Sequence, residues 1–296
     1  MSKPYDSLRE KLLDRFDYWN DDITDDDVFD FSQYDLGDYV KNNKHLYLYQ
    51  YRRPDYYSIR NLETQKIHLS KSGTFNDVYE GMPIGRKDDF KTNNTGLYDL
   101  AYVSCFSEVS DSQLMWSHYA DSHKGFCVQY DLKLLQKDPF KTIKHIFPVM
   151  YSPIRLINHN IPEMVDLLGE LRNAVKNEDD FFNIDYFDNV LPLLIRKSSC
   201  WEYEKEWRII YTLKHIYDYY DELSEKDYAL LKAGTIPFPC VSSVFIGYRI
   251  EEEKKNHIVE ICNRLSRETG REIPVYKAYL SNNSYDILFD DIKQTE

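Results

Sequence analysis

Several features that the chain lacks narrow the classes of protein to which it can belong. Its 296 residues include five cysteines but no Cys-x-x-Cys pair, which argues against a zinc site and against a disulfide framework. No apolar run approaches the roughly 20 residues that a membrane-spanning helix needs. The N-terminus is polar and has no signal-peptide core. We therefore expect a cytoplasmic protein without a membrane partner.

Positive charge is also scarce. Lysine and arginine total 37 against 50 aspartate and glutamate residues, which gives a net charge of −13. Nonspecific binding to nucleic acids depends on clustered positive charge, so this balance disfavours such binding. The negative net charge is compatible with a local basic pocket, and with nucleic acid as a substrate that the protein modifies.

The common catalytic motifs are missing as well. The sequence has no phosphate-binding P-loop, no Gly-x-Gly-x-x-Gly and no Gly-x-Ser-x-Gly elbow. His118 and His123 lie five residues apart, which does not fit the metal-binding HExxH arrangement. We therefore predict no metal cofactor.

Apolar and alternating runs predict strands separated by helical segments. We predict an α+β fold, in which a single mixed domain over 45–296 has a central, largely antiparallel sheet. A helical insertion is expected at about 155–200, and an N-terminal helical and acidic appendage at 1–44. The strands are expected at 45–52, 66–70, 100–107, 126–131, 147–151, 204–211, 241–246 and 273–280, with helices near 110–118 and 251–267.

The appendage contains an acidic run at 21–30. Such a run is usually a solvated loop or the start of a helix. In the alternative interpretation it is an arm that binds a protein partner or inhibits the domain.

The segment 115–126 concentrates side chains that are suited to ligand binding. It carries Trp116, His118, Tyr119 and Lys124 ahead of a glycine, and it joins a helical segment to an apolar strand. A polar, aromatic helix end that faces a strand is a common place for binding residues. In the alternative, His118 and Trp116 lie at the edge of the core and satisfy each other.

Three polar residues, Asn76, Asp77 and Glu80, follow the strand expected at 66–70. Asn and Asp are natural turn formers, because their side chains hydrogen-bond nearby backbone groups. A structural turn explains Asn76 and Asp77, whereas glutamate is not a typical turn former, so a turn does not explain Glu80. We keep Asn76 and Glu80 as candidate binding residues.

The segment 201–208 holds a second concentration of charge. If 204–211 is a strand, Glu204, Glu206 and Arg208 share one face, because side chains alternate along a strand. A surface salt-bridge ladder is one interpretation, and it would contribute little stability. In the other, one carboxylate polarises a sugar hydroxyl or stabilises a cationic centre while its neighbour positions a nucleophile.

The order of these motifs resembles the DUF2971 family of bacterial and phage-associated proteins, which is named for its lack of an assigned function. The resemblance covers roughly residues 45–250. One departure is Val78, because the family often has proline at this place. The motifs are Leu48-Tyr-Gln-Tyr-Arg52, Ile67-His-Leu-Ser70, Phe75-Asn-Asp-Val-Tyr-Glu80, Ser104-Cys-Phe-Ser107, Met115-Trp-Ser-His-Tyr-Ala120, His123-Lys-Gly-Phe126 and Trp201-Glu-Tyr-Glu-Lys-Glu-Trp-Arg208.

A second resemblance is to the ADP-ribosyltransferase fold, in which an early strand carries Arg or His and a late strand carries the catalytic Glu. Here Arg52 ends the first strand, Ser70 ends the second, and Glu204-Lys-Glu206 lies on a late strand. The Ser-Thr-Ser signature of many such enzymes is missing after Ile67.

This second resemblance implies roles for several residues. Tyr51 and Arg52 would hold the phosphates and ribose of NAD, and Glu206 would stabilise an oxocarbenium-like transition state. His118 and Tyr119 would stack on the nicotinamide or hydrogen-bond to it. The candidate catalytic residues are Glu206, Glu204 and His118, and the candidate binding residues are Tyr51, Arg52, Ser70, Asn76, Glu80, Trp116, Tyr119, Lys124 and Arg208.

The resemblances together imply an NAD-consuming ADP-ribosyltransferase or NAD glycohydrolase, as a toxin or an anti-phage effector, with NAD as its substrate. In the alternative, the same cleft belongs to a non-catalytic nucleotide-sensing or protein-interaction module of a bacterial defence system. The enzyme hypothesis predicts that Arg52, His118 and Glu206 lie within reach of one small ligand.

Overall fold

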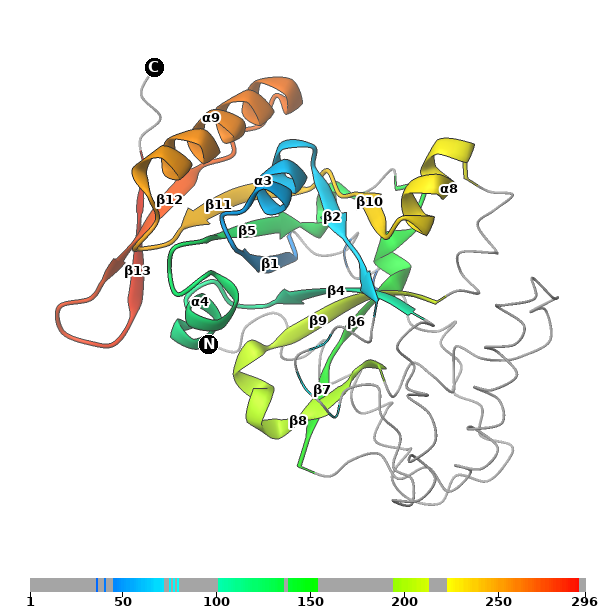
Figure 1. Ribbon diagram of the computed structural model, residues 1–296, viewed down its shortest axis with the longest axis horizontal. Coiled ribbons are helices and arrows are strands. Elements are labelled where there is room, and N and C mark those ends of the chain that lie inside the picture. The colour runs from blue at the N-terminus through cyan, green and yellow to red at the C-terminus, as the bar shows by residue number, and fades with distance from the viewer. Residues whose placement is uncertain are drawn as a thin grey trace.

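The computed structural model describes residues 45–71, 101–135, 138–153, 194–212 and 223–292, together with the single residues 36, 40, 75, 77 and 79. These residues form a mixed α+β fold around one large sheet, as the sequence predicts (Figure 1). Apart from 36, 40 and 194–200, the predicted appendage and insertion lie outside the described residues.

The large sheet is built mostly from antiparallel neighbours, in the order β13-β12-β11-β5-β1-β4-β9-β6, with β3 paired to β4. Among the described strands of this sheet, only β11 and β12 pair in parallel, and helix α9 connects them. The strands are β1 (Tyr47–Arg52), β3 (Ser70–Lys71), β4 (Ala101–Ser107), β5 (Phe126–Asp131), β6 (Ile146–Pro148), β9 (Glu206–Thr212), β11 (Val241–Ile246), β12 (Val275–Leu280) and β13 (Ile287–Asp291).

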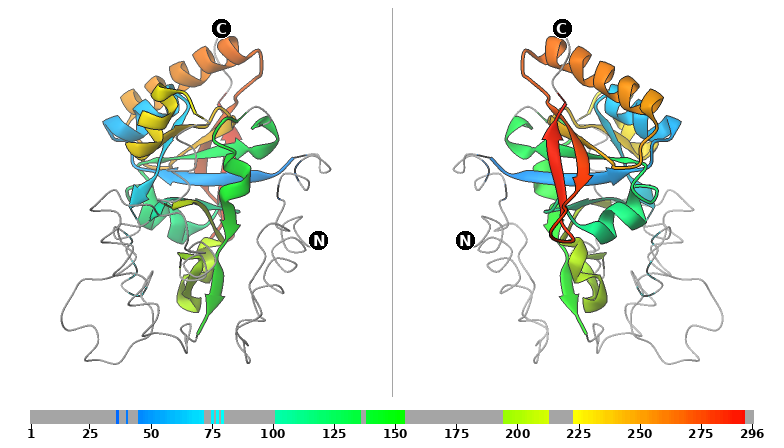
Figure 2. Two further views of the ribbon diagram at one scale, coloured as in Figure 1. Left: turned by 90° about the vertical axis from the view of Figure 1, so that its right-hand side faces the viewer. Right: turned by 90° about the vertical axis from the view of Figure 1, so that its left-hand side faces the viewer.

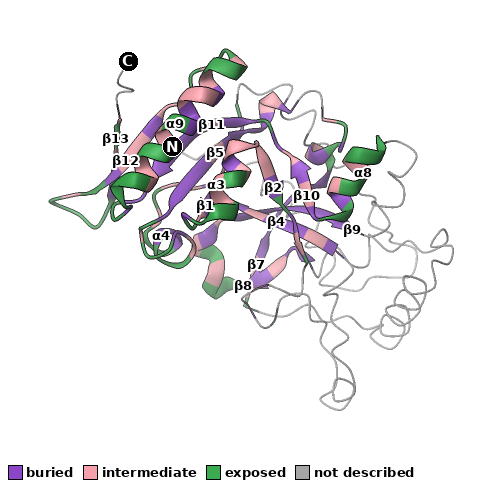
Figure 3. Cartoon of the chain, turned by 45° about the horizontal axis from the view of Figure 1, so that its top comes forward, coloured by how far each residue is buried: buried purple, intermediate pink, exposed green. Residues whose placement is uncertain are grey.

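Helix α9 (Glu252–Thr269) covers one face of the sheet, and Figure 3 shows its exposed outer side and buried inner side. Gly270 ends the helix with a φ of 65°, a left-handed conformation that glycine adopts without a steric cost. Its buried residues recur with the spacing of one helical face: Ile258, Ile261, Cys262 and Leu265.

The two faces of the sheet hold separate cores, because side chains alternate along each strand. In β5, Phe126 and Val128 belong to the larger core and Cys127 belongs to the smaller one. Helices α9 and α3 (Tyr56–Glu63) pack on the larger core. Figure 2 shows both helices on the same side of strand β1. Helix α4 (Gln113–Tyr119) packs into the smaller core, which fixes it beside β1.

The remaining elements surround the large sheet. The strands expected at 66–70 and 147–151 are each divided in two, because Leu69 and Val149 donate their backbone N–H groups to Gly234 and Glu206 instead. These elements are β2 (Lys66–His68) paired with β10 (Thr235–Pro237), β7 (Met150–Ser152) paired in parallel with β8 (Arg196–Ser198), α8 (Glu225–Lys232), and the 3₁₀ helices η5 (Leu132–Leu134), η6 (Thr142–His145) and η7 (Ser199–Glu204).

The sheet is incomplete between β1 and β4. These strands pair at one position, Tyr49 with Ser107, whereas β1 pairs with β5 along its whole length. The side chain of Gln50 bridges the gap, because its Nε2 donates to Ser104 Oγ and to the carbonyl oxygen of Cys105, both at 3.0 Å. We call this incompletely paired junction between β1 and β4 the seam.

Candidate functional site

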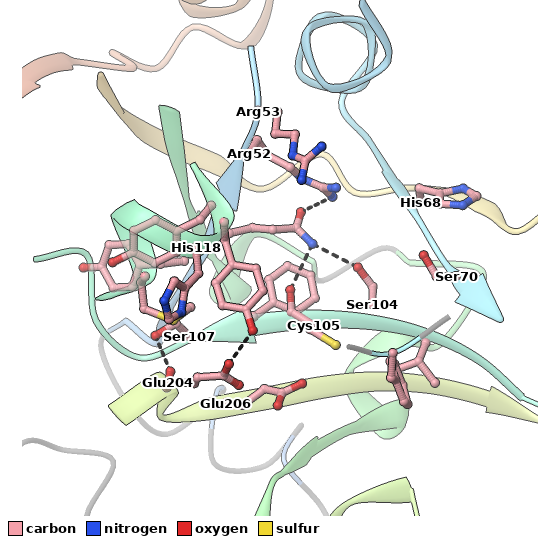
Figure 4. Close-up of a pocket in the computed structure, with 18 of the residues that line it drawn as sticks. Arg52, Arg53, His68, Ser70, Ser104, Cys105, Ser107, His118, Glu204 and Glu206 are labelled. Atoms are coloured by element: carbon pink, nitrogen blue, oxygen red, sulfur yellow. Dashed lines mark hydrogen bonds between the residues drawn. The ribbon is translucent and has the colours of Figure 1, made fainter. Parts of the chain in front are cut away.

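A cavity of about 410 Å³ lies at the seam. Its walls come from β1, β2, β3, β4, α4, β8 and the junction between η7 and β9. This volume lies within the range of small-molecule sites. Segments that are far apart in the sequence therefore meet around one space (Figure 4).

Most of the residues that the sequence singles out meet at this cavity. Trp116, Lys124 and Arg208 do not line it, and Asn76 and Glu80 lie outside the described residues. The candidates that line it are Tyr51, Arg52, Ser70, His118, Tyr119, Glu204 and Glu206.

One end of the cavity, which we call the carboxylate end, is formed by Glu204, Glu206 and Lys197. Glu206 begins β9 and pairs with Arg208 on the same strand face, with 2.7 Å between Nε of Arg208 and Oε1 of Glu206. Lys197 enters from β8, and its Nζ lies 3.0 Å from Oε2 of Glu206. The surface-ladder interpretation is wrong, because the exposed fractions of Glu204 and Glu206 are 3% and 4%.

Glu204 reaches the same place by a different route from the one predicted. It ends η7 and is not part of the strand, because Lys205 adopts a left-handed conformation with a φ of 46° and β9 begins only after it. Its carboxylate nevertheless turns inward, where Oε1 accepts from the hydroxyl of Tyr119 at 2.5 Å. Oε2 accepts from Lys197 Nζ at 2.6 Å.

The two carboxyl groups have pKa values that are shifted in opposite directions. Desolvation by burial, followed by the charge of Glu206, raises the pKa of Glu204. Burial also acts to raise the pKa of Glu206, but the charges of Arg208 and Lys197 outweigh it and lower this pKa well below its usual range. Glu206 is therefore ionised at neutral pH, and Glu204 is the more readily protonated of the two.

The opposite end, which we call the arginine end, is formed by Arg52 and Arg53 with His68 and Ser70 (Figure 4). Nη2 of Arg52 donates to Oε1 of Gln50 at 2.5 Å, so the residue that bridges the seam also orients this guanidinium. Among the described residues, neither arginine forms an ion pair with a carboxylate. Desolvation and the charge of Arg52 lower the pKa of His68, so its imidazole is neutral at neutral pH.

A tight turn between α4 and β5 supports the arginine end. Residues 121–123 all have positive φ, at 49°, 54° and 69°. A Cβ atom at Gly125 would lie 2.1 Å from the carbonyl oxygen of Arg52, and one at Gly247 would lie 2.3 Å from that of His123. Both positions therefore require glycine, and together they clamp the turn between β1 and β11.

Helix α4 supplies the rim of the cavity. His118 Nδ1 lies 3.1 Å from the hydroxyl of Tyr203, and the two rings stack edge to face. Trp116 is fully buried and donates from Nε1 to the carbonyl of Ser110 at 2.7 Å, so it and His118 do not satisfy each other. The hydroxyl of Tyr51 already donates to Val109, which leaves its ring as the part that borders the cavity.

Sequence reasoning missed several lining residues, among them Gln50, Arg53, His68 and Lys197. Arg53 could have been found, because it follows Arg52 directly. Lys197 carries no local signal, because an isolated lysine is usually solvated. Its burial depends on β8 pairing with β7, which lies more than forty residues earlier in the chain.

The comparisons with known proteins bear on part of this site. The family model DUF2971, a protein of unknown function, matches residues 115–209. This match supports the resemblance seen in the sequence. The matched segment contains α4 from Met115 onward and every residue of the carboxylate end, whereas the arginine end precedes it. No curated protein and no solved structure matches the chain.

Two further properties concern metals and membranes. In the part of the chain that the structure describes, no group of three or more His, Cys, Asp or Glu residues is arranged to hold a metal ion. No helix within the described ranges has the length and apolar character needed to cross a membrane.

Proposed function

We propose that the cavity binds NAD and that the protein cleaves its nicotinamide–ribose bond, as an ADP-ribosyltransferase or an NAD glycohydrolase. The observation that carries this proposal is the division of the cavity into an arginine end and a carboxylate end. Arg52, Ser70 and Glu206, which the resemblance to ADP-ribosyltransferases brings together, all line it.

The charges of NAD match those of the two ends. Its diphosphate carries two negative charges, and guanidinium groups bind phosphate oxygens through paired hydrogen bonds. Arg52 and Arg53 are available for such bonds, because neither has a carboxylate partner among the described residues. The nicotinamide ring is cationic, and its ribose develops positive charge as the bond breaks.

The carboxylate end suits that developing charge. Two fixed, buried carboxylates would stabilise an oxocarbenium-like centre electrostatically, as carboxylates do in glycoside cleavage. Glu206 stays ionised, and the rings of His118 and Tyr119 at the rim provide surfaces for stacking of the nicotinamide. Loss of NAD through this reaction would suit a toxin or an anti-phage effector.

A second candidate function is a nucleotide-sensing module without turnover. It is favoured by the hydrogen bonding of Glu206, whose two oxygens are already held by Arg208 and Lys197. A site of this kind would bind NAD or ADP-ribose and would release no nicotinamide.

The test is to incubate the purified protein with NAD and to measure nicotinamide release. The Glu204→Gln and Glu206→Gln variants should each lose release. The matched control is Glu202→Gln, because Glu202 lies in the same turn but is exposed and pairs with Lys205 at the surface. Thermal unfolding of each variant confirms that it is folded.

The possible results separate the hypotheses. Release that is lost in both cavity variants and kept in the control supports the enzyme. NAD-induced thermal stabilisation without release supports the sensing module. Neither release nor stabilisation would remove both, and equal release from all variants would remove the role of the carboxylates.

A further inference from the structure

Lys197 occupies a position that is rare for a lysine. The exposed fraction of its side chain is 3%, and it enters the cavity from β8, a strand outside the large sheet. Its Nζ lies 2.6 Å from Glu204, 3.0 Å from Glu206 and 5.0 Å from the centroid of the Trp201 ring. A buried ammonium group of this kind is retained only where its charge is compensated.

The two carboxylates depend on Lys197 to different degrees. Glu206 has a second cation, Arg208, which holds it through Nε and Nη2. For Glu204, Lys197 is the only cation in an ion pair with it among the described residues. Without Lys197, Glu204 would keep the hydroxyl of Tyr119 but would face the like charge of Glu206 unopposed.

The groups that surround Glu204 come from four elements. They are Lys197 of β8, Glu206 of β9, Tyr119 of α4 and Tyr203 of η7. Each oxygen of Glu204 accepts one hydrogen bond in this arrangement. Since a carboxylate oxygen has two lone pairs, each oxygen retains one that can take a proton from the cavity.

We propose that Lys197 is a positioning residue that keeps Glu204 ionised, so that Glu204 accepts the proton of the attacking nucleophile. This inference rests on the proposed function and names the base of that reaction. The oxygen of a water or of an acceptor hydroxyl bonds to C1′ of the nicotinamide ribose. The C1′–N bond breaks, its electron pair neutralises the nicotinamide ring, and the proton of the nucleophile passes to Glu204.

In this assignment the two carboxylates have different roles. Glu206, held by Arg208, keeps a permanent negative charge beside the reacting carbon. Glu204 is the group that changes its protonation state during turnover. Lys197 touches both carboxylates, but Glu204 depends on it more, because Glu206 also has Arg208.

The first experiment follows nicotinamide release against pH at saturating NAD, in the wild type and in Lys197→Met, Lys197→Arg and Lys205→Met. In Lys197→Met the acid limb of the profile should move up by roughly two pH units, because an opposite charge at this distance shifts a carboxyl pKa by about 1–3 units. Lys197→Arg should restore the limb. Lys205→Met is the matched control, because Lys205 is an exposed neighbour that pairs with Glu202.

The second experiment needs no turnover. Infrared difference spectra of the ligand-free protein with labelled glutamate report protonated carboxyl groups directly. Lys197→Met should gain a protonated glutamate band at neutral pH, and the Lys197→Met/Glu204→Gln double variant should lose it. Lys205→Met should show no such band.

A third variant covers the case in which Lys197→Met does not fold. Tyr119→Phe removes the other hydrogen bond to Glu204 and only one hydroxyl group. It should move the acid limb in the same direction by a smaller amount, because a neutral hydrogen bond stabilises the carboxylate less than an ammonium charge does.

The outcomes decide between this inference and the function on which it rests. If the wild type releases nicotinamide but the acid limb stays in place in Lys197→Met, or in Tyr119→Phe where that variant stands in, the inference is overturned and the function survives. If the wild type releases none, the proposed function and the base role of Glu204 fall together. The infrared spectrum then still decides whether Lys197 holds Glu204 ionised, and absence of the band in Lys197→Met would overturn that role too.

Discussion

The two ends of the cavity differ in how their charged side chains are paired. At the carboxylate end, Glu204 and Glu206 are both in ion pairs within the protein, with Lys197 and Arg208 as partners. At the arginine end, Arg52 is oriented by a neutral side chain, Gln50. The charges at the carboxylate end are therefore paired within the protein, whereas the charge of Arg52 is available to pair with an anionic ligand.

This difference indicates what each end contributes. Where charges are paired and buried, the fold depends on both partners, because removal of one leaves an uncompensated charge in the interior. Charges that lack a partner contribute to ligand affinity instead, because their interactions form only when an anion binds. The four predictions that follow, ordered from the largest expected effect to the smallest, separate stability at one end from affinity at the other.

Loss of a partner at the carboxylate end should be the most damaging change. Arg208→Met should lower the free energy of unfolding by about 3–5 kcal/mol, because it removes a cation from a buried ion pair. The control Lys205→Met should cost less than about 1 kcal/mol, because the Lys205–Glu202 pair is exposed. Urea unfolding measures both, and similar losses in the two variants would contradict the division.

A methyl group at Gly125 should damage the arginine end through the backbone. Gly125→Ala should lower the free energy of unfolding by about 2–3 kcal/mol and weaken ADP-ribose binding, because its Cβ would meet the carbonyl of Arg52. Gly270→Ala is the control: it also has a positive φ, but nothing lies within 4 Å of its Cβ, so it should cost about 1 kcal/mol and leave binding unchanged. Calorimetric titration with ADP-ribose gives the second readout.

Removal of Arg53, which has no carboxylate partner in the part of the chain that the structure describes, should affect affinity alone. Arg53→Ala should weaken ADP-ribose binding about tenfold or more, because a hydrogen bond to a charged group contributes about 1.5–3 kcal/mol. Its melting temperature should stay unchanged, because the side chain forms no ion pair among the described residues. Arg60→Ala, an exposed arginine on α3, is the matched control and should change neither. A drop in stability with unchanged affinity would reverse the assignment.

The smallest effect concerns pH. Glu204 has a raised pKa, so above the ordinary glutamate value of about 4.3 the folded state binds more protons at this group than the unfolded state does. In that window its contribution makes the protein more stable as pH falls. Glu206 has a lowered pKa, so its contribution is present above that value and is lost as pH falls below it.

The corresponding measurement is urea unfolding of three variants across this pH range. Glu204→Gln should remove the gain of stability on mild acidification, whereas Glu202→Gln should keep it. Arg53→Ala should also keep it, because the gain comes from Glu204 at the other end of the cavity. Loss of the gain in the Arg53 variant would mean that the two ends are electrically coupled.

Alternation along a strand was sufficient to place part of the site from sequence. Glu206 and Arg208 share a face of β9, and Arg52 ends β1, as predicted from spacing alone. Spacing gave the wrong element for Glu204. Because Lys205 has a left-handed backbone conformation, the strand begins at Glu206, two positions after the predicted start. Backbone conformations of that kind have no periodic pattern to reveal them.

The remaining parts of the site depend on contacts between distant segments. Lys197 is buried only because β8 pairs with β7, and Gln50 matters only because β1 and β4 fail to pair along their length. Neither residue differs in its local sequence from a solvated one. Hydrophobic periodicity predicts which strands exist, but it does not predict where two strands part.

The clamp between Gly125 and Gly247 has a consequence for folding during synthesis. The contacting residues Gln50 and Ser104 are separated by 54 positions in the sequence, and Tyr119 and Glu204 by 85. The turn after α4 packs against Gly247, which comes later in the chain than all of them. Contacts over such sequence distances form late, because chain entropy opposes them. A ribosome-bound chain that ends before β11 therefore has the residues of both ends without the clamp that holds them together. Ligand binding should begin only when translation of the domain is nearly complete.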